Sequence, residues 1–148
     1  MIVLAFDPGE TTGYAVLSSD RETFVMGSFE GWSLVRALMG SYLPDVVVVE
    51  QYKLYPYAAR SQVWSSFPTV EVIGVIKYLA ERHSIPVVEQ SAADAKFVNV
   101  KRTKEKKGDR HAYSALRHAL LHLRRQGADG ELRDFYSIRP RRAPTLHT

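Results

Sequence analysis

The chain has 148 residues, of which 45% are hydrophobic and 24% charged, with a net charge of +4 and a pI near 9.4. These values predict one domain with a substantial core and argue against global disorder. The absence of cysteine excludes disulfides, thiolate metal sites and cysteine nucleophiles, and fits a reducing cytoplasm. No apolar run reaches the ~20 residues that span a bilayer, and the first residues lack the basic stretch of a signal peptide.

The first half of the chain predicts three strands, a helix and a fourth strand. Short apolar runs over 2–6, 13–19 and 23–29 favour an antiparallel meander with a tight connection at 20–21. Helical spacing of apolar residues follows over 33–42 and ends at a proline. The continuous valine run within 45–50 is typical of a central parallel strand that is covered on both faces.

The second half predicts alternating helices and a strand, with an irregular aromatic-rich segment over 51–68. The expected elements are a helix over 69–83, a strand over 85–89, a short helix over 92–98 capped by Ser91 and a helix over 111–125. The order predicts an α/β fold with a mixed five-stranded sheet, three antiparallel strands leading into parallel ones. We assign residues 1–126 to this domain and 127–148 to a basic tail.

Two acids close strands that otherwise hold no charge, Asp7 after the first and Glu50 at the end of the valine run. If these strands run parallel, their ends emerge side by side, where ligands of α/β sheets bind. Two close carboxylates repel each other unless they are protonated or bridged by a cation, and oxygen ligands suit Mg²⁺ or Mn²⁺. The simpler interpretation, a turn at Asp7 and a solvated Glu50, is less favoured for both acids together.

A third group of candidate residues stands at the start of the last helix. Asp109 and His111 lie in or near its first turn, and face the sheet if the apolar face does. Asp109 would also serve as an ordinary N-cap, and His111 as a surface residue. The amino end of a helix favours an anionic ligand such as a phosphate, so we interpret both residues as candidates for the same site.

Three stretches together resemble a known family. They are FDPGETTGYAV at 6–16, VVVVEQY at 46–52 and GDRHAYSALRHALLHL at 108–123. In order and spacing they are similar to the RuvC-like Holliday junction resolvases of the RNase H superfamily, above all to the short forms found in bacteriophages. The resemblance covers residues 1–125. It implies an RNase H-like sheet flanked by helices, a homodimer and an endonuclease that resolves four-way or other branched DNA, located in the host cytoplasm if phage-encoded.

The resemblance also implies a metal-binding site. By position, Asp7, Glu50 and His111 become ligands of two Mg²⁺ or Mn²⁺ ions; we assign Asp7 as the shared ligand, Glu50 to one ion, and His111 together with Asp109 to the other. The family has an acid three residues after the His111 position, where this chain has Ser114. Asp109 replaces that acid, Ser114 acts through a water, or catalysis is impaired. The implied reaction is phosphodiester hydrolysis that leaves 5′-phosphate and 3′-hydroxyl ends.

Basic and aromatic residues beside the candidate site predict contacts with DNA. The segment 101–107 carries five positive charges, which would neutralise backbone phosphates, although charge runs are commonly solvated loops. Aromatics interleaved with cations after Glu50 suit stacking on unpaired bases, and Tyr52 or Tyr55 is the candidate for the wedge that the resemblance implies. The candidate DNA-binding residues are Tyr52, Lys53, Tyr55, Lys101, Arg102, Lys104, Lys106, Lys107 and Arg110.

Several other residues receive simpler interpretations. Trp64 and Phe67 are predicted to pack under the long loop. His118 and His122 have zinc-compatible helical spacing but no neighbouring third ligand in the sequence, so we interpret them as packing or surface residues. Gly74 in the 69–83 helix suits either a dimer interface or an ordinary core helix.

Alternative functions stay open. The residues from Asp7 to Thr12 also resemble the first phosphate loop of actin-like and sugar-kinase ATPases, but those need two lobes and 148 residues hold one. Ser114 favours a non-catalytic junction-binding protein. A related nuclease that acts on another branched or RNA-containing substrate would use the same chemistry.

Overall fold

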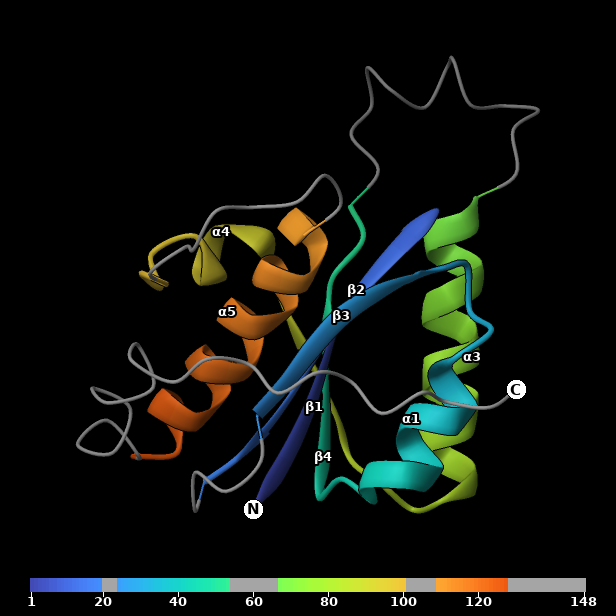
Figure 1. Cartoon of the computed structure of the whole chain (residues 1–148), viewed down its shortest axis with the longest axis horizontal. Helices are drawn as coiled ribbons and strands as arrows, with labels where there is room; N and C mark the ends of the chain where they lie inside the picture. Colours follow the sequence, from blue (N-terminus) through green and yellow to red (C-terminus); the bar gives the residue numbers. More distant parts are fainter. Residues whose placement is uncertain (20–23, 54–66, 101–108, 128–148) are drawn as a thin grey trace.

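The computed structural model describes residues 1–19, 24–53, 67–100 and 109–127. In chain order the elements are β1 (Ile2–Asp7), β2 (Thr11–Ser18), β3 (Phe24–Glu30), α1 (Val35–Tyr42), β4 (Val46–Glu50), α3 (Pro68–Arg82), β5 (Val87–Gln90), α4 (Ala92–Ala95) and α5 (Asp109–Arg125). Helices α4 and α5 cover one face of the sheet, while α1 and α3 cover the other (Figure 1). None of the helices in these ranges could cross a bilayer.

The sheet has five strands in the order β3-β2-β1-β4-β5. Strands β1, β2 and β3 pair antiparallel, whereas β4 runs parallel to β1 and β5 parallel to β4. The predicted fold class, a mixed α/β sheet that begins with an antiparallel meander, is therefore confirmed.

Alternation along the central strands divides the core into two layers. In β1, Val3 and Ala5 pack toward α5, while Leu4 and Phe6 pack toward α1 and α3. Strand β4 behaves in the same way, and all four of its valines are buried. Successive side chains of a strand point to opposite faces, so an unbroken apolar run is what a strand covered on both sides requires.

The helices follow the predicted apolar spacing. In α3, Val72, Ile76 and Ala80 recur every fourth residue and are buried, and Pro68 begins the helix, where its missing N–H costs nothing. In α5, the predicted apolar face is buried throughout; it consists of Ala112, Ala115, Leu116, Ala119, Leu120 and Leu123.

Some boundaries differ from the predicted ones. The strand predicted over 85–89 runs from Val87 to Gln90. It begins later than predicted because the Ile85 N–H donates to the carbonyl oxygen of Ala80 in α3 (2.8 Å) and so belongs to the end of that helix. The short helix after Ser91 ends at Ala95 instead of residue 98, although Ser91 caps it as predicted by accepting from the Asp94 N–H. The last helix begins two residues earlier, at Asp109.

The connection at 20–21, the basic run at 101–107 and residues 128–148 lie outside the described residues. The division into a domain over 1–126 and a tail over 127–148 therefore stays a prediction.

Candidate active site

Three strands end in polar side chains at the same edge of the sheet. Asp7 is the last residue of β1, Glu50 of β4 and Gln90 of β5. Phe6 pairs with Val49 and Glu50 pairs with Gln90, so the three end residues are neighbours in register. The alternation that turns Val3 and Ala5 toward α5 turns all three end residues toward that helix as well.

Helix α5 lays a stripe of polar side chains across these strand ends. His111 Nδ1 lies 3.0 Å from Asp7 Oδ2. One turn later, Ser114 Oγ donates to Glu50 Oε2 at 3.2 Å. One further turn along, His118 Nε2 lies 2.8 Å from the same Glu50 oxygen. Spacings of three and four residues keep side chains on one helix face, so a single helix contacts both carboxylates.

A glycine permits the helix to come this close. Gly13 of β2 pairs with Asp7, and its backbone lies directly under the first turn of α5. A Cβ at Gly13 would overlap the backbone carbonyl of His111 and lie 2.6 Å from the Ala112 nitrogen. Any larger residue would push the helix away from the sheet, and His111 with it.

The turn after Asp7 is held by a buried threonine. The Thr12 hydroxyl lies 3.2 Å from the Gly9 carbonyl oxygen and 3.0 Å from that of Gly31, and the Gly9 N–H reaches the same hydroxyl at 3.4 Å. Thr12 is fully buried. The Asp-Pro-Gly turn is therefore fixed to β3 as well as to β2, which holds Asp7 at a defined strand end.

The two carboxylates share a poorly hydrated environment. The Asp7 side chain is 14% exposed and that of Glu50 23%. Burial raises the pKa of Asp7 above its usual value, and the nearby Glu50 charge raises it further, while hydrogen bonds from His111 and Ser114 oppose the shift. The pair therefore gains from a proton or a cation that offsets its negative charge.

A hard divalent cation fits this donor set. Magnesium is usually held by one or two carboxylates together with water and substrate oxygens, without a complete protein cage. Within the described ranges no three His, Asp or Glu side chains form a group that could by itself hold a metal ion. The Asp7–Glu50 pair, with its raised Asp7 pKa, fits a cation that completes its shell with water and phosphate oxygens.

No protein-family model matches the sequence, and no curated protein matches it either. Solved structures do. Thermus thermophilus RuvC matches in complex with a Holliday junction substrate (TM-score 0.63) and in a second structure (TM-score 0.62), each at 17% identity over 86% of this chain and 97% and 98% of theirs. The yeast mitochondrial Holliday junction resolvase matches with a TM-score of 0.51 at 16% identity, over 91% of this chain and 82% of its own.

The fold is that of the RuvC-like resolvases. The resemblance first suggested by three short stretches of sequence is thus confirmed at the level of the fold. In this RuvC-like fold, Asp7, Glu50, His111 and Ser114 lie together, while the bacteriophage character stays a prediction.

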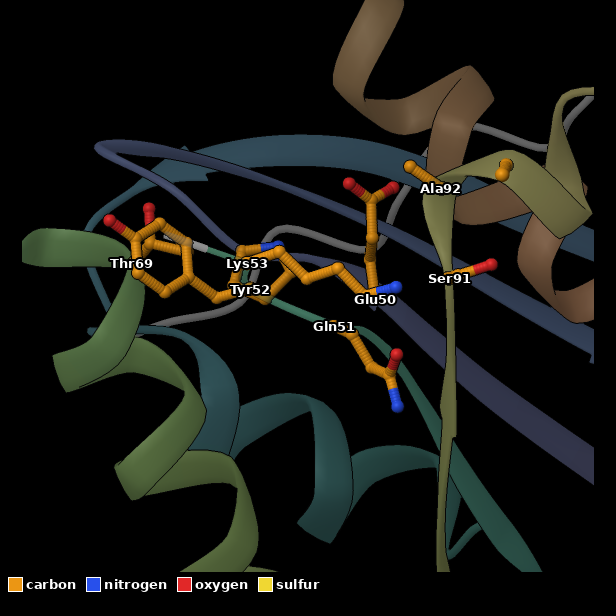
Figure 2. Close-up of a pocket in the computed structure, with 9 residues that line it drawn as sticks. Glu50, Gln51, Tyr52, Lys53, Thr69, Ser91 and Ala92 are labelled. Carbon is orange, nitrogen blue, oxygen red and sulfur yellow. The ribbon is translucent and has the colours of Figure 1, made fainter. Parts of the chain in front are cut away.

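A cavity of about 310 Å³ opens beside Glu50 (Figure 2). Its wall is formed by Pro8, Glu50, Gln51, Tyr52, Lys53, Thr69, Ser91, Ala92 and Ala93. Glu50 and Gln51 point to opposite sides of the chain, as successive strand residues do (Figure 2), and Tyr52 and Thr69, at the start of α3, both line the cavity. The cavity thus joins the candidate site of the RuvC-like fold to two residues predicted to contact DNA.

The other predicted DNA-binding residues are only partly described. Arg110 is exposed, and its Nε lies 3.5 Å from His111 Nε2, so it stands next to the site. Lys53 is exposed at the cavity. The rest lie outside the described residues, as does the side chain of Asp109; they are Tyr55, Lys101, Arg102, Lys104, Lys106 and Lys107.

Sequence reasoning missed two residues of this cluster. His118 is fully buried, as packing predicts, but its ring also bonds Glu50 and Gln90. Its partner Glu50 is 68 residues away, so no neighbouring residue in the sequence points to the contact. The signal that was available is spacing, because His118 follows His111 by two helical turns. Gln90 was missed because the strand was predicted to end at residue 89.

Proposed function

We propose that this protein is a metal-dependent endonuclease that resolves four-way DNA junctions. The observation that supports it best is the meeting of Asp7 and Glu50 under one helix, at the strand ends of a RuvC-like fold. One protein with this fold is a resolvase whose structure includes a Holliday junction substrate.

Asp7 and Glu50 are the residues that would hold Mg²⁺ or Mn²⁺, with Asp7 shared between two ions and His111 and Asp109 completing the second. Bound divalent ions would polarise the scissile phosphate and lower the pKa of an attacking water. The chain's own contribution is to orient the carboxylates: His111 bonds Asp7, and Ser114 bonds Glu50. The water would lose a proton to solvent, its oxygen would join phosphorus as the bond to the 3′-oxygen breaks, and the departing 3′-oxygen would take up a proton from solvent, which leaves 5′-phosphate and 3′-hydroxyl ends.

Ser114 is the residue on which the choice between a catalytic and a non-catalytic protein depends. Its hydroxyl donates to Glu50, so it orients an acid where a carboxylate would repel one. We assign the missing acidic role to Asp109, which begins the same helix. A non-catalytic junction-binding protein is the second candidate, and the serine in place of an acid is the feature that favours it.

We place the DNA over the edge of the sheet that carries the site. Tyr52 and Lys53 at the cavity and Arg110 beside His111 surround the carboxylates with an aromatic and two cations. Neutralising phosphates with such residues is the main source of affinity for DNA. The basic run at 101–107 extends this surface in the proposal.

A homodimer would present two such sites to a symmetric junction. Helix α3 leaves Val70 and Tyr78 exposed (48% and 59%) with Gly74 between them, which supports this helix as the interface. Val70, Gly74 and Tyr78 follow one another at intervals of four residues, which places them on one stripe of the helix. The bacteriophage origin and the location in the host cytoplasm stay predictions.

The deciding experiment is cleavage of a labelled four-way junction with Mg²⁺ or Mn²⁺. We expect paired nicks that DNA ligase can reseal, no nicks in EDTA, and little cleavage of a linear duplex of the same sequence. Binding without nicks under both metals would favour the non-catalytic candidate. Preferred cleavage of an RNA–DNA hybrid or another branched substrate would identify a related nuclease instead.

A further inference from the structure

Behind the carboxylate pair, two buried polar side chains continue from Glu50 into the core. His118 is 0% exposed, and Gln90 is 1% exposed. His118 Nε2 lies 2.8 Å from Glu50 Oε2, and His118 Nδ1 lies 2.8 Å from Gln90 Oε1. Gln90 is also the register neighbour of Glu50 on the adjacent strand. The His118 ring therefore lies between the two strand ends. It contacts Glu50 at the end of β4 through one nitrogen and Gln90 at the end of β5 through the other.

We propose that His118 and Gln90 are positioning residues that fix the orientation of the Glu50 carboxylate, an inference that rests on the proposed function. An imidazole and a primary amide are costly to bury in an apolar layer. Their neighbours on this face are Ala115, Ala119 and Val88, so an aliphatic residue would suit packing alone. The contact with Glu50 explains why two polar side chains are buried at these positions.

The chemistry of the carboxylate fixes the direction of the bond between His118 and Glu50. A carboxylate only accepts, so His118 Nε2 carries the proton that is donated to Glu50. His118 Nδ1 lies 2.8 Å from Gln90 Oε1, and the amide can bond this nitrogen either through that oxygen or, turned by half a turn, through its NH₂. When the amide oxygen faces His118, the Gln90 nitrogen is buried and has no hydrogen-bond partner among the residues that the structure describes. In either orientation the amide holds the His118 ring so that its Nε2–H points at Glu50.

Two donors then converge on one oxygen of Glu50. Ser114 Oγ approaches Oε2 from the side of the site at 3.2 Å, and His118 approaches it from the core at 2.8 Å. With Oε2 held by two donors, the carboxylate cannot rotate freely. Residues that orient a metal-binding carboxylate in this way typically change metal affinity or activity 10–100-fold when they are replaced.

The test compares five variants with the wild type, one of which, Glu50→Ala, removes the carboxylate itself. His118→Phe removes both ring nitrogens at similar volume, His118→Gln keeps one donor, and Gln90→Leu removes the amide. His122→Phe is the matched control, because His122 is buried on the next turn of α5 and was not placed in the site. Thermal melts verify that each variant folds.

The first readout is the wild-type ring itself, by long-range ¹H–¹⁵N NMR without metal. We expect an Nε2-protonated His118 with a slowly exchanging proton, perturbed by Gln90→Leu and by Glu50→Ala but not by His122→Phe. A ring without a proton on Nε2, or with a freely exchanging proton there, would overturn the proposal. This measurement needs no cleavage, so it tests the role of His118 even if the junction-cleavage assay fails.

The second readout is Mn²⁺ affinity of the free protein by calorimetry, together with cleavage of the junction. We expect 10–100-fold losses in Mn²⁺ affinity and kcat for His118→Phe, smaller losses for His118→Gln, and unchanged junction Kd in both. A folded His118→Phe variant with wild-type Mn²⁺ affinity would show that His118 is only a packing residue, and would overturn the proposal. If His118→Phe does not fold, Gln90→Leu carries the same expectation, and its wild-type behaviour would equally overturn the proposal.

Discussion

On the side of the sheet that α1 and α3 cover, β1 and β4 present apolar residues up to their last positions, with Phe6 and Val49 buried there. On the α5 side the same strands begin apolar and end in Asp7 and Glu50. Both faces follow one alternation of period two. The comparison shows that the candidate site is the last row of side chains in a packed layer. Its two carboxylates are therefore mostly shielded from water, like the core residues beside them.

The largest expected effect tests the polar row directly. Glu50→Gln or Asp7→Asn should lower junction cleavage at least ~1,000-fold while junction binding survives, because the proposed metal ligands supply most of the transition-state stabilisation. Single-turnover cleavage and gel-shift assays measure the two effects. Glu89→Gln is the control, since Glu89 is next to Gln90 in sequence but pairs with Lys77 at 2.6 Å, away from the site. Retained cleavage in either site variant would remove that acid from the mechanism.

A substitution on the apolar face should lower the stability of the protein and leave the rate of cleavage unchanged. Ile76→Ala in α3 leaves a cavity in the layer opposite the site, and should lower the free energy of unfolding by about 2–5 kcal/mol. Urea denaturation measures this, and cleavage per folded molecule should stay near wild type. A large loss of kcat in the folded variant would show that the two faces are coupled.

Gly13→Ala should affect both properties, because Gly13 lies where α5 meets the sheet. The added methyl group overlaps the His111 backbone, so we expect a loss of about 1–3 kcal/mol of stability and slower cleavage. Gly74→Ala is the control, since no atom of the described residues lies within 4 Å of a Cβ there. Equal stability of the two variants would contradict the close approach of α5 to β2.

A smaller effect concerns the Asp7 carboxyl in metal-free buffer. Its pKa is raised in the folded state by burial and by Glu50, so its stabilising contribution is present at low pH and is lost as pH rises through the folded value. Asp7→Asn should therefore be more stable than wild type at pH 7, by about 1 kcal/mol, with the gap closing below pH ~4. Denaturant melts across pH measure it.

Replacing Asp94 should change stability in the opposite direction to replacing Asp7. Arg125 and Ser91 lower the pKa of that carboxyl, so Asp94→Asn should lower stability at pH 7. A stability gap for Asp7→Asn that widens toward acid pH would contradict the environment described for Asp7.

The smallest effect is expected from the basic run. Replacing Lys104, Lys106 and Lys107 by Gln should weaken junction binding several-fold at moderate salt and flatten its salt dependence, because fewer counterions are released. Binding titrations at several salt concentrations measure the slope. An unchanged slope would remove this segment from the DNA surface.

Much of the site could be predicted, because it depends on local patterns. The valine run that ends in Glu50 predicted a buried parallel strand with an acid at its end. The apolar run before the Asp-Pro-Gly turn likewise predicted a buried strand that ends at Asp7. His118 could not be assigned in this way, since a buried histidine on an apolar helix face has many uses. Gln90 depended on a strand boundary, and boundaries shift with neighbouring hydrogen bonds such as that of Ile85.

The sequence by itself determined the strands, their alternation and the charged residues at their ends, because these follow from contacts between near neighbours in the chain. Only the tertiary structure decided that His111 meets Asp7 across 104 residues and that His118 meets Glu50 across 68. Those contacts depend on how closely α5 packs on the sheet, which Gly13 permits from a distant strand. Hydrogen bonds act over about 3 Å, so the packing of whole elements decides which polar groups become partners.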